Sequence, residues 1–292
     1  LVNIHQIQYS HHLKIPFAKN GLLGVTVFFV LSGFLITRIL ITEIEETHTI
    51  DLKNFWIRRI RRLIPAVLSM AVVIIFVSAV VNRVVFTKGC KDFVASVLGF
   101  NNWWQIFNKV SYFEAAGAPS PFTHCWSLAI ETQFYLIYPI LLLLLARVVR
   151  GRKKRGKVFA IVSALLAVVS MILMAVLYNP NGDPSRVYYG TDTRAFSLLI
   201  GALAAIQLEY RIIKVRLPRK IWALIGSISL VILTCMMIFI SSYSSFLYYG
   251  GQVILSVLTA FVVYAVTVSR SILNKILGNN ALKWIGDRSY SI

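Results

Sequence analysis

Stretches of about 20 mostly apolar residues recur along this chain, and they limit what it can fold into. They lie near residues 22–41, 64–81, 127–146, 158–178, 195–208, 221–241 and 247–268. Because a helix needs about 20 apolar residues to cross a hydrocarbon core about 30 Å thick, each stretch is predicted to be a transmembrane helix. A shorter apolar stretch near 93–107 is predicted to be interfacial or re-entrant. The predicted fold class is all-α, a polytopic bundle of transmembrane helices.

The composition supports a membrane protein. Apolar residues make up 58% of the 292 residues and charged residues 14%, which is too hydrophobic for a soluble domain of this length. No stretch reads as a cleavable signal peptide, and no long linker divides the chain. We therefore expect residues 1–292 to form a single transmembrane domain. The first residues resemble the tail of a helix and 290–292 the start of another, so we expect this domain to be incomplete at both termini.

The net charge of +19 is distributed unevenly along the chain. Most of the 30 lysine and arginine residues fall in alternate loops between the predicted spans, and residues 147–157 form the densest of these loops. Such alternation is the positive-inside pattern, which predicts a multi-pass protein of the cell membrane with its basic loops in the cytoplasm. The charge is then explained by orientation and contact with membrane lipids. We expect no binding of nucleic acid.

The cysteines Cys90, Cys125 and Cys235 are isolated, without the paired spacing of metal ligands. We expect neither a disulfide framework nor a metal site.

Of the 11 acidic residues, only Glu131 falls inside a predicted span. A charged group there costs about 2.5–3.5 kcal/mol, so it requires polar partners. Residues three or four apart share a helix face, and this face carries a polar stripe of His124, Ser127, Glu131, Tyr135 and Tyr138. The stripe is predicted to face the bundle interior or a water-filled cavity. A polar seam that joins helices remains the alternative to a functional cavity.

Two further polar clusters lie at the predicted outer half of the membrane. His11 and His12 precede the first full span, and histidine can exchange a proton near neutral pH as a general base. They could equally be interfacial residues that contact lipid headgroups. Tyr188, Thr191, Asp192 and Arg194 lie at the outer mouth of a later span. An ordinary helix start, capped by Asp or Thr, is the alternative interpretation.

The stretch "FWIRRIRRLIPA" at 55–66 carries four arginines, Arg58, Arg59, Arg61 and Arg62. Arginine binds phosphate groups in a bidentate manner, so this cluster could hold a nucleotide-like ligand. A plain positive-inside anchor is the alternative.

Five motifs, in order along the chain, resemble membrane-bound acyltransferase family 3. They read "GLLGVTVFFVLSGFLIT", "RRIRRLIPA", "NNWW", "HCWSLAIETQFYLIYP" and "YYGTDTRAFSLLIGALAA". The likeness is greatest to bacterial O-acetyltransferases that modify peptidoglycan and other surface polysaccharides. It implies a bundle of about eight to ten transmembrane helices. It also implies transfer of an acyl group, usually acetyl from cytoplasmic acetyl-CoA as donor, to a hydroxyl of an extracytoplasmic glycan.

The resemblance also implies roles for single residues. His12, followed by Leu13, matches the family's essential histidine, a general base or proton shuttle. Glu131 would orient and acidify a neighbouring imidazole or tyrosine. Tyr135 and Tyr188 match family tyrosines, which would carry the acyl group transiently or position the acceptor.

Binding roles follow in the same way. Arg58, Arg59, Arg61 and Arg62 would hold the phosphates of acyl-CoA. The acceptor glycan would be bound by His124, Trp126, Ser127, Asp192 and Arg194, with Trp126 stacked on a sugar ring. The donor and acceptor sites would then lie on opposite sides of the membrane.

Two features depart from the family pattern. The family carries an arginine eleven positions before its histidine, and this position corresponds to Leu1. Some relatives also append a soluble hydrolase-like domain, and we expect none here because no G-x-S-x-G motif is present. A separate soluble extracytoplasmic acyltransferase could then complete the reaction.

Two other functions stay open at this point. One is a proton-coupled transporter or flippase of a glycan or lipid-linked sugar, and the other is an inactive gene fragment. The sequence leaves the acceptor glycan, the acyl group and the oligomeric state undetermined.

Overall fold

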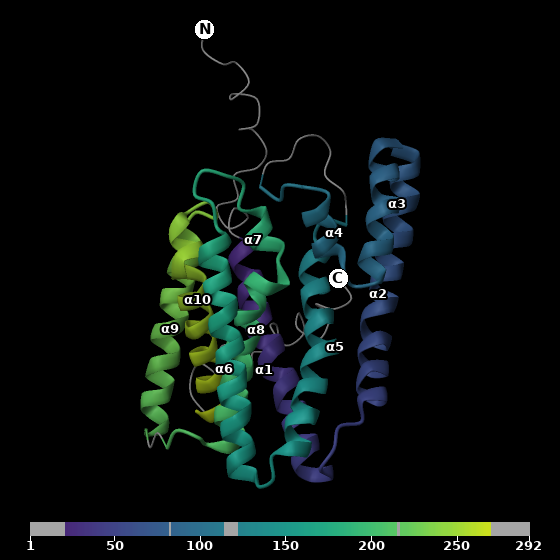
Figure 1. The fold of residues 1–292 in the computed structure, drawn as a ribbon. Coiled ribbons are helices and arrows are strands. Elements are labelled where there is room, and N and C mark those ends of the chain that lie inside the picture. Colours follow the sequence, from purple (N-terminus) through teal and green to yellow (C-terminus); the bar gives the residue numbers. More distant parts are fainter. Residues whose placement is uncertain (1–20, 82, 114–121, 215–216, 270–292) are drawn as a thin grey trace.

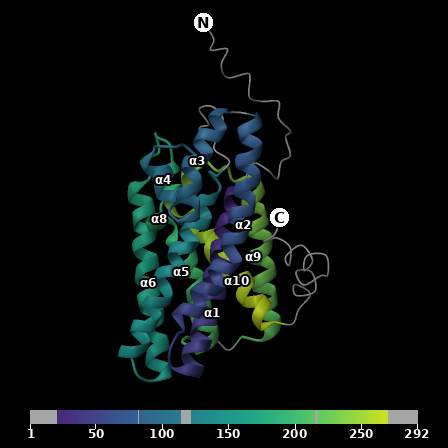
Figure 2. The same ribbon diagram turned by 90° about the vertical axis from the view of Figure 1, so that its right-hand side faces the viewer.

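The computed structural model describes residues 21–81, 83–113, 122–214 and 217–269, which form helices and no strand (Figure 1). In chain order these helices are α1 (Gly21–Thr47), α2 (Leu52–Val81), α3 (Arg83–Val97), α4 (Asn101–Phe107), α5 (Cys125–Val148), α6 (Arg152–Leu177), α7 (Ser185–Tyr189), α8 (Thr191–Tyr210), α9 (Arg219–Phe239), the π-helical segment η3 (Leu247–Gly251) and α10 (Gln252–Val268). The long helices run side by side along one axis, in the view of Figure 1 and in the perpendicular view of Figure 2. The predicted all-α bundle is confirmed.

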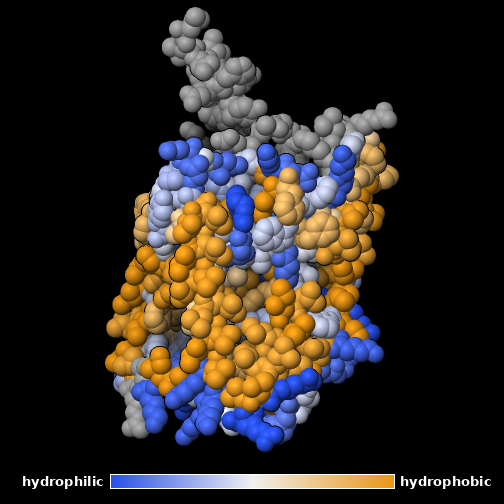
Figure 3. Space-filling model, in the orientation of Figure 1, coloured by the Kyte–Doolittle hydropathy of each residue, from blue (hydrophilic) through white to orange (hydrophobic). Residues whose placement is uncertain are grey.

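Six helices of the described residues are long and apolar enough to cross a membrane: α1, α2, α5, α6, α9 and the combined η3 and α10. On the face seen in Figure 3, a broad apolar belt lies between two hydrophilic ends. The stretch predicted near 195–208 is also helical, as α8, but it is not among the six. It packs against α1, α6 and α10. Because these neighbours cover α8, it can carry polar residues that lipid would not tolerate.

The two ends of the bundle differ. The connections 48–51 and 149–151 and residues 211–214 lie at one end, at the bottom of Figure 1, which we call the basic end. The opposite end holds α3, α4 and α7. At the basic end, Arg155 forms an ion pair with Glu45 at 2.9 Å. The Tyr210 hydroxyl donates a hydrogen bond of 2.7 Å to the same carboxylate, so α1, α6 and α8 are tied together there.

Two segments differ in extent from the predicted spans. Helix α2 begins at Leu52 rather than near residue 64, so the arginine cluster lies within the helix. The stretch 93–107 contains the end of α3 and all of α4, which are both too short to cross the membrane.

Two glycines allow α1 and α8 to pack closely. A Cβ on Gly33 would overlap the backbone carbonyl of Leu198, and a Cβ on Gly201 would overlap that of Val30. Small residues at such contacts let membrane helices approach each other with their backbones. This close contact places α1 at the centre of the bundle, between α8, α10 and α5.

Candidate functional site

The Glu131 carboxylate is fully buried in the bundle. The polar groups that act on it are the hydroxyls of Ser32 and Tyr135 and the guanidinium groups of Arg59 and Arg62. Its two oxygens make no hydrogen bond of standard geometry with the part of the chain that the structure describes. The site therefore combines an enclosed carboxylate with hydroxyls from α1 and α5 and positive charge from α2.

The hydroxyls of Ser32 and Tyr135 are hydrogen-bonded to each other beside this carboxylate. Farther along α5, the hydroxyl of Tyr138 pairs with that of Ser163 at 2.9 Å. A carboxylate beside a pair of buried hydroxyls can accept a proton from them and return it.

The predicted polar stripe divides into two parts. Glu131, Tyr135 and Tyr138 are buried, as expected for a stripe that faces the bundle interior. Ser127 is half-buried, and His124 is exposed at the end opposite the basic end. The other face of α5 presents Leu136, Ile137, Ile140 and Leu144, which are exposed, as expected for a surface in contact with lipid.

Arg59 extends from α2 toward α5. Its guanidinium carbon lies 5.4 Å from the centre of the Phe55 ring and 5.8 Å from that of Tyr135. Aromatic ring faces attract a cation, so these contacts orient the side chain. Arg62 lies three residues further on the same helix face. Arg59 is half-buried, whereas Arg58, Arg61 and Arg62 are exposed. Two of the four predicted phosphate-binding arginines, Arg59 and Arg62, thus lie within electrostatic range of Glu131.

A hydrogen bond between α2 and α5 sets this arrangement. Pro139 lies inside α5 and has no N–H, so the backbone carbonyl of Tyr135, four residues earlier, lacks its usual helical partner. The indole N–H of Trp56 donates to this carbonyl oxygen at 3.1 Å. Freed carbonyls within a membrane need such partners, because lipid offers none.

A second polar group, Arg194, is buried at the opposite end from the basic loops. Its Nη2 donates to the Thr26 hydroxyl at 3.0 Å, and its guanidinium faces the rings of Phe29 at 5.7 Å and Tyr188 at 5.1 Å. Its Nε and Nη1 make no hydrogen bond with the described residues. Two nitrogens of a fully buried cation, with three N–H groups between them, are therefore left for a further acceptor.

Aromatic rings surround this arginine. The ring centroids of Trp126 and Tyr188 are 4.4 Å apart, and those of Tyr112 and Tyr188 are 4.8 Å apart. Burial raises the pKa of Tyr188 well above its usual value, and it also raises the pKa of Tyr112. Both phenols are therefore neutral near pH 7 and can act as hydrogen-bond donors.

Helix α1 connects the two polar groups. Phe29 packs edge-on against Trp126 with centroids 6.1 Å apart, and it also faces Arg194. Ser32, three residues later on the same helix face, bonds to Tyr135 beside Glu131. One face of α1 therefore runs from the Arg194 group to the Glu131 site.

A hydrogen-bond network at the opposite end holds α7 in place. Gln133 donates to the Asn102 side chain at 2.9 Å and accepts from the Thr191 hydroxyl at 2.5 Å. Asn102 in turn donates to the backbone carbonyl of Tyr189 at 3.0 Å. The "NNWW" motif thus fixes the segment that carries Tyr188.

The remaining predicted residues lie apart from these groups or outside the described chain. Asp192 accepts two hydrogen bonds from Arg186, at 3.1 and 2.8 Å, rather than pairing with Arg194. Trp126 is buried. His12 lies outside the described residues. In the described part of the chain, no group of three or more His, Cys, Asp and Glu residues could hold a metal ion.

Several residues that shape these groups carry little or no signal in the sequence. Thr26 and Ser32 are small polar residues inside an apolar span, which is a weak signal for a buried contact. Trp56 and Tyr112 gave no signal, because their partners lie far away along the chain.

Fold and site together define a multi-pass membrane protein with a buried carboxylate, arginine and phenol groups. A family model described as an acyltransferase domain matches residues 2–292, so the chain belongs to this acyltransferase family.

Several curated proteins are similar over 97% of the chain. It is 43% identical over 286 residues to the peptidoglycan O-acetyltransferase OatA of Listeria monocytogenes. It is 41% identical to the putative peptidoglycan O-acetyltransferase YrhL of Bacillus subtilis and 38% identical to a putative O-acetyltransferase of Staphylococcus aureus. The chain covers 45–46% of the length of these relatives, a little under half of each. No solved structure matches it.

Proposed function

We propose that this chain is the membrane part of an O-acetyltransferase that moves an acetyl group from acetyl-CoA to a hydroxyl of a cell-wall glycan. The observation that carries the proposal is the buried Glu131 carboxylate, which lies beside the Tyr135 hydroxyl and within reach of Arg59 and Arg62. Family membership and the names of the relatives support the reaction class.

The donor would bind near the lower half of α2. The acetyl-CoA phosphates need several cationic donors, and Arg58, Arg61 and Arg62 are exposed there. Arg59 is held over the Tyr135 ring and would guide the thioester toward Glu131. In this arrangement the arginines of α2 bind the donor, in addition to any role in orienting the protein in the membrane.

The transfer would occur in two steps that conserve atoms and charge. In the first, a protein hydroxyl such as that of Tyr135 attacks the thioester, the carbon–sulfur bond breaks, and an ester forms. The hydroxyl proton passes to Glu131 and then to the CoA thiolate. In the second step, a glycan hydroxyl attacks this ester and its proton returns to the protein hydroxyl, with His12 as the general base.

The acceptor would enter at the end that holds α7. His124 and Ser127 are accessible there, whereas Trp126 is buried and supports the Tyr188 ring. The free donors of Arg194 would bind the carbonyl oxygen as negative charge develops on it, and preorganised donors of this kind stabilise such an oxyanion. Tyr188 would position the acceptor, and Asp192 would act indirectly by holding Arg186.

The proposed setting is the cell membrane, with the basic end in the cytoplasm, where acetyl-CoA is found. The loop pattern supports this orientation. The partners would then be membrane lipids, the extracytoplasmic glycan and a soluble extracytoplasmic acyltransferase domain or protein. No metal ion takes part in the proposed steps.

The test uses cells that lack their own cell-wall O-acetyltransferase and express the whole protein that contains this chain. Mild base releases ester-linked acetate from purified peptidoglycan, and this acetate is measured. We expect Glu131→Gln to lower it about a hundredfold, the typical contribution of a general acid–base group. Glu46→Gln, the same change at an exposed site of the basic end, should leave it unchanged. Equal acetate from the Glu131→Gln protein, present at the same level in the membrane, would refute the proposal.

A further inference from the structure

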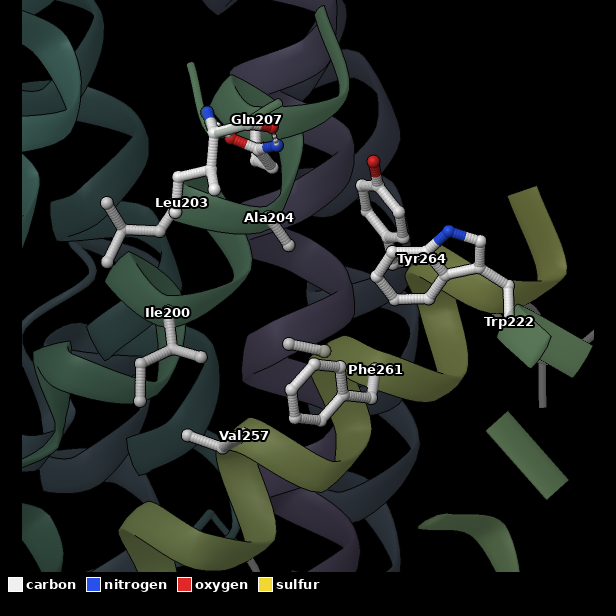
Figure 4. A pocket seen from close by; sticks show the side chains of 10 residues that line it. Ile200, Leu203, Ala204, Gln207, Trp222, Val257, Phe261 and Tyr264 are labelled. Atoms are coloured by element: carbon white, nitrogen blue, oxygen red, sulfur yellow. Dashed lines mark hydrogen bonds between the residues drawn. The ribbon is translucent and has the colours of Figure 1, made fainter. Parts of the chain in front are cut away.

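A groove of about 310 Å³ lies between α8, α9 and α10 (Figure 4). Its lining includes Ile200, Leu203, Val257, Phe261, Trp222 and Tyr264. None of its lining residues belongs to α2 or α5, which carry the Glu131 site. The groove is therefore a separate feature of the bundle.

The groove offers an apolar interior. Gln207 is the one amide side chain in its lining, and both of its polar atoms are occupied. Its Nε2 donates to the backbone carbonyl of Ile213 at 2.7 Å, and its Oε1 accepts from the backbone N–H of Ile213 at 3.0 Å. An occupant would therefore be held by apolar contacts, as a hydrocarbon chain is.

The groove extends from the basic end into the apolar belt. Gln207 and Tyr264 lie near the ends of α8 and α10, and Trp222 lies in the first turn of α9. Val257 lies seven residues before Tyr264, about 10 Å deeper along the helix axis. Since ligand pockets measure roughly 300–1,000 Å³, this volume suits one acyl chain rather than a whole lipid.

Positively charged residues lie beside the groove at the basic end, after α8 and at the start of α9. Arg211, Lys214, Arg219 and Lys220 are exposed there, and none forms an ion pair with the carboxylates of the described residues. The neighbouring Glu209 is already paired with Arg38 at 2.9 Å. Arg219 lies three residues before Trp222, on the same face of α9. A basic rim above an apolar groove complements an anionic headgroup above an acyl chain.

We propose that this groove binds one acyl chain of an anionic phospholipid, whose phosphate is held by the basic rim. The ligand comes from the leaflet around the basic end. Trp222 and Tyr264, with ring centroids 4.7 Å apart, lie at the headgroup level, where such side chains are usually found in membrane proteins.

The test is native mass spectrometry of the whole protein in detergent, with phosphatidylglycerol or phosphatidylcholine of identical acyl chains added. Ala204→Phe fills the groove, and Ala260→Leu is a milder filling variant. Arg219→Ser with Lys220→Ser removes rim charge. Lys153→Ser with Lys154→Ser removes the same charge from the exposed start of α6 and serves as the control. The melting temperature of each variant reports whether it is folded.

We expect the unmodified protein to retain phosphatidylglycerol in preference to phosphatidylcholine. Retention should fall about fivefold for each rim charge removed and should also fall in the folded groove-filling variants, but not in the control. Equal retention of the two lipids would overturn the proposal. Retention unchanged by every variant would also overturn it, and so would a dimer that forms through the groove and excludes lipid.

Discussion

The indole N–H of Trp56 on α2 is bonded to the backbone carbonyl oxygen of Tyr135 on α5, at 3.1 Å. This bond fixes the height of α2 relative to α5 and so places Arg59, one turn above Trp56, beside Glu131. It uses a carbonyl that Pro139 leaves without a helical partner. A proline in one helix thus determines where the arginines of another helix lie.

Replacement of this indole tests the relationship. Trp56→Phe leaves the Tyr135 carbonyl unpaired, and we expect the free energy of unfolding in detergent to fall by about 1 kcal/mol. Adding Pro139→Ala restores a backbone N–H for the carbonyl and should recover most of this loss. If the unfolding free-energy changes of the two substitutions simply add in the double variant, the hydrogen bond between Trp56 and the Tyr135 carbonyl is contradicted.

The close contact of α1 and α8 gives a second prediction. Gly33→Ala forces a methyl group against the Leu198 backbone, and such overpacking costs about 1–3 kcal/mol of unfolding free energy. The matched control is Gly24→Ala in the same helix, where the nearest atom, in Met237, lies 3.9 Å from the added Cβ. The control should be neutral or slightly stabilising. Equal losses in the two variants, measured by unfolding in detergent, would show that the contact is not tight.

The buried phenol of Tyr188 makes the free energy of unfolding depend on pH. Its folded-state pKa lies well above the ordinary value of 10.0, so the unfolded chain releases this proton first as the pH rises. The stabilising contribution is therefore fully present below about pH 10 and is lost as the pH rises further. We expect the unfolding free energy to decline above that pH, and to decline less steeply in Tyr188→Phe. Identical pH curves for the two proteins would contradict the burial of this phenol.

Replacement of Arg194 is expected to change stability and acetate transfer in different ways. A buried charge with unused donors costs desolvation energy, and replacing such a group with an apolar side chain is often neutral or stabilising. We expect Arg194→Met to keep or raise the unfolding free energy while abolishing acetate transfer. A loss of stability of more than about 3 kcal/mol would show instead that the arginine has a structural ionic partner.

Much of the fold could be predicted from the sequence, because an apolar stretch of membrane length has few alternatives to a helix. The burial of Glu131, Tyr135 and Tyr138 followed from their spacing on one helix face. Helix α8 was predicted as a helix, but its apolar stretch did not reveal that neighbouring helices would cover it.

The assembly of the candidate site was harder to predict. The sequence places Arg59 and Arg62 on one face of a helix, but it does not set the height of that helix in the membrane. That height depends on Trp56 and Tyr135, which are 79 residues apart. Likewise, Asp192 and Arg194 are close in sequence but point to different partners, since a separation of two residues places side chains on different helix faces.

The most direct test of the account is the release of free CoA thiol from acetyl-CoA by the whole protein in membrane vesicles whose basic end is accessible. We predict rapid release from the unmodified protein and from the controls Glu46→Gln and Lys53→Gln, with release about a hundredfold slower in Glu131→Gln and Arg59→Gln. Release from Glu131→Gln at the unmodified rate, or movement of glycan across the membrane without any release of CoA, would contradict the account.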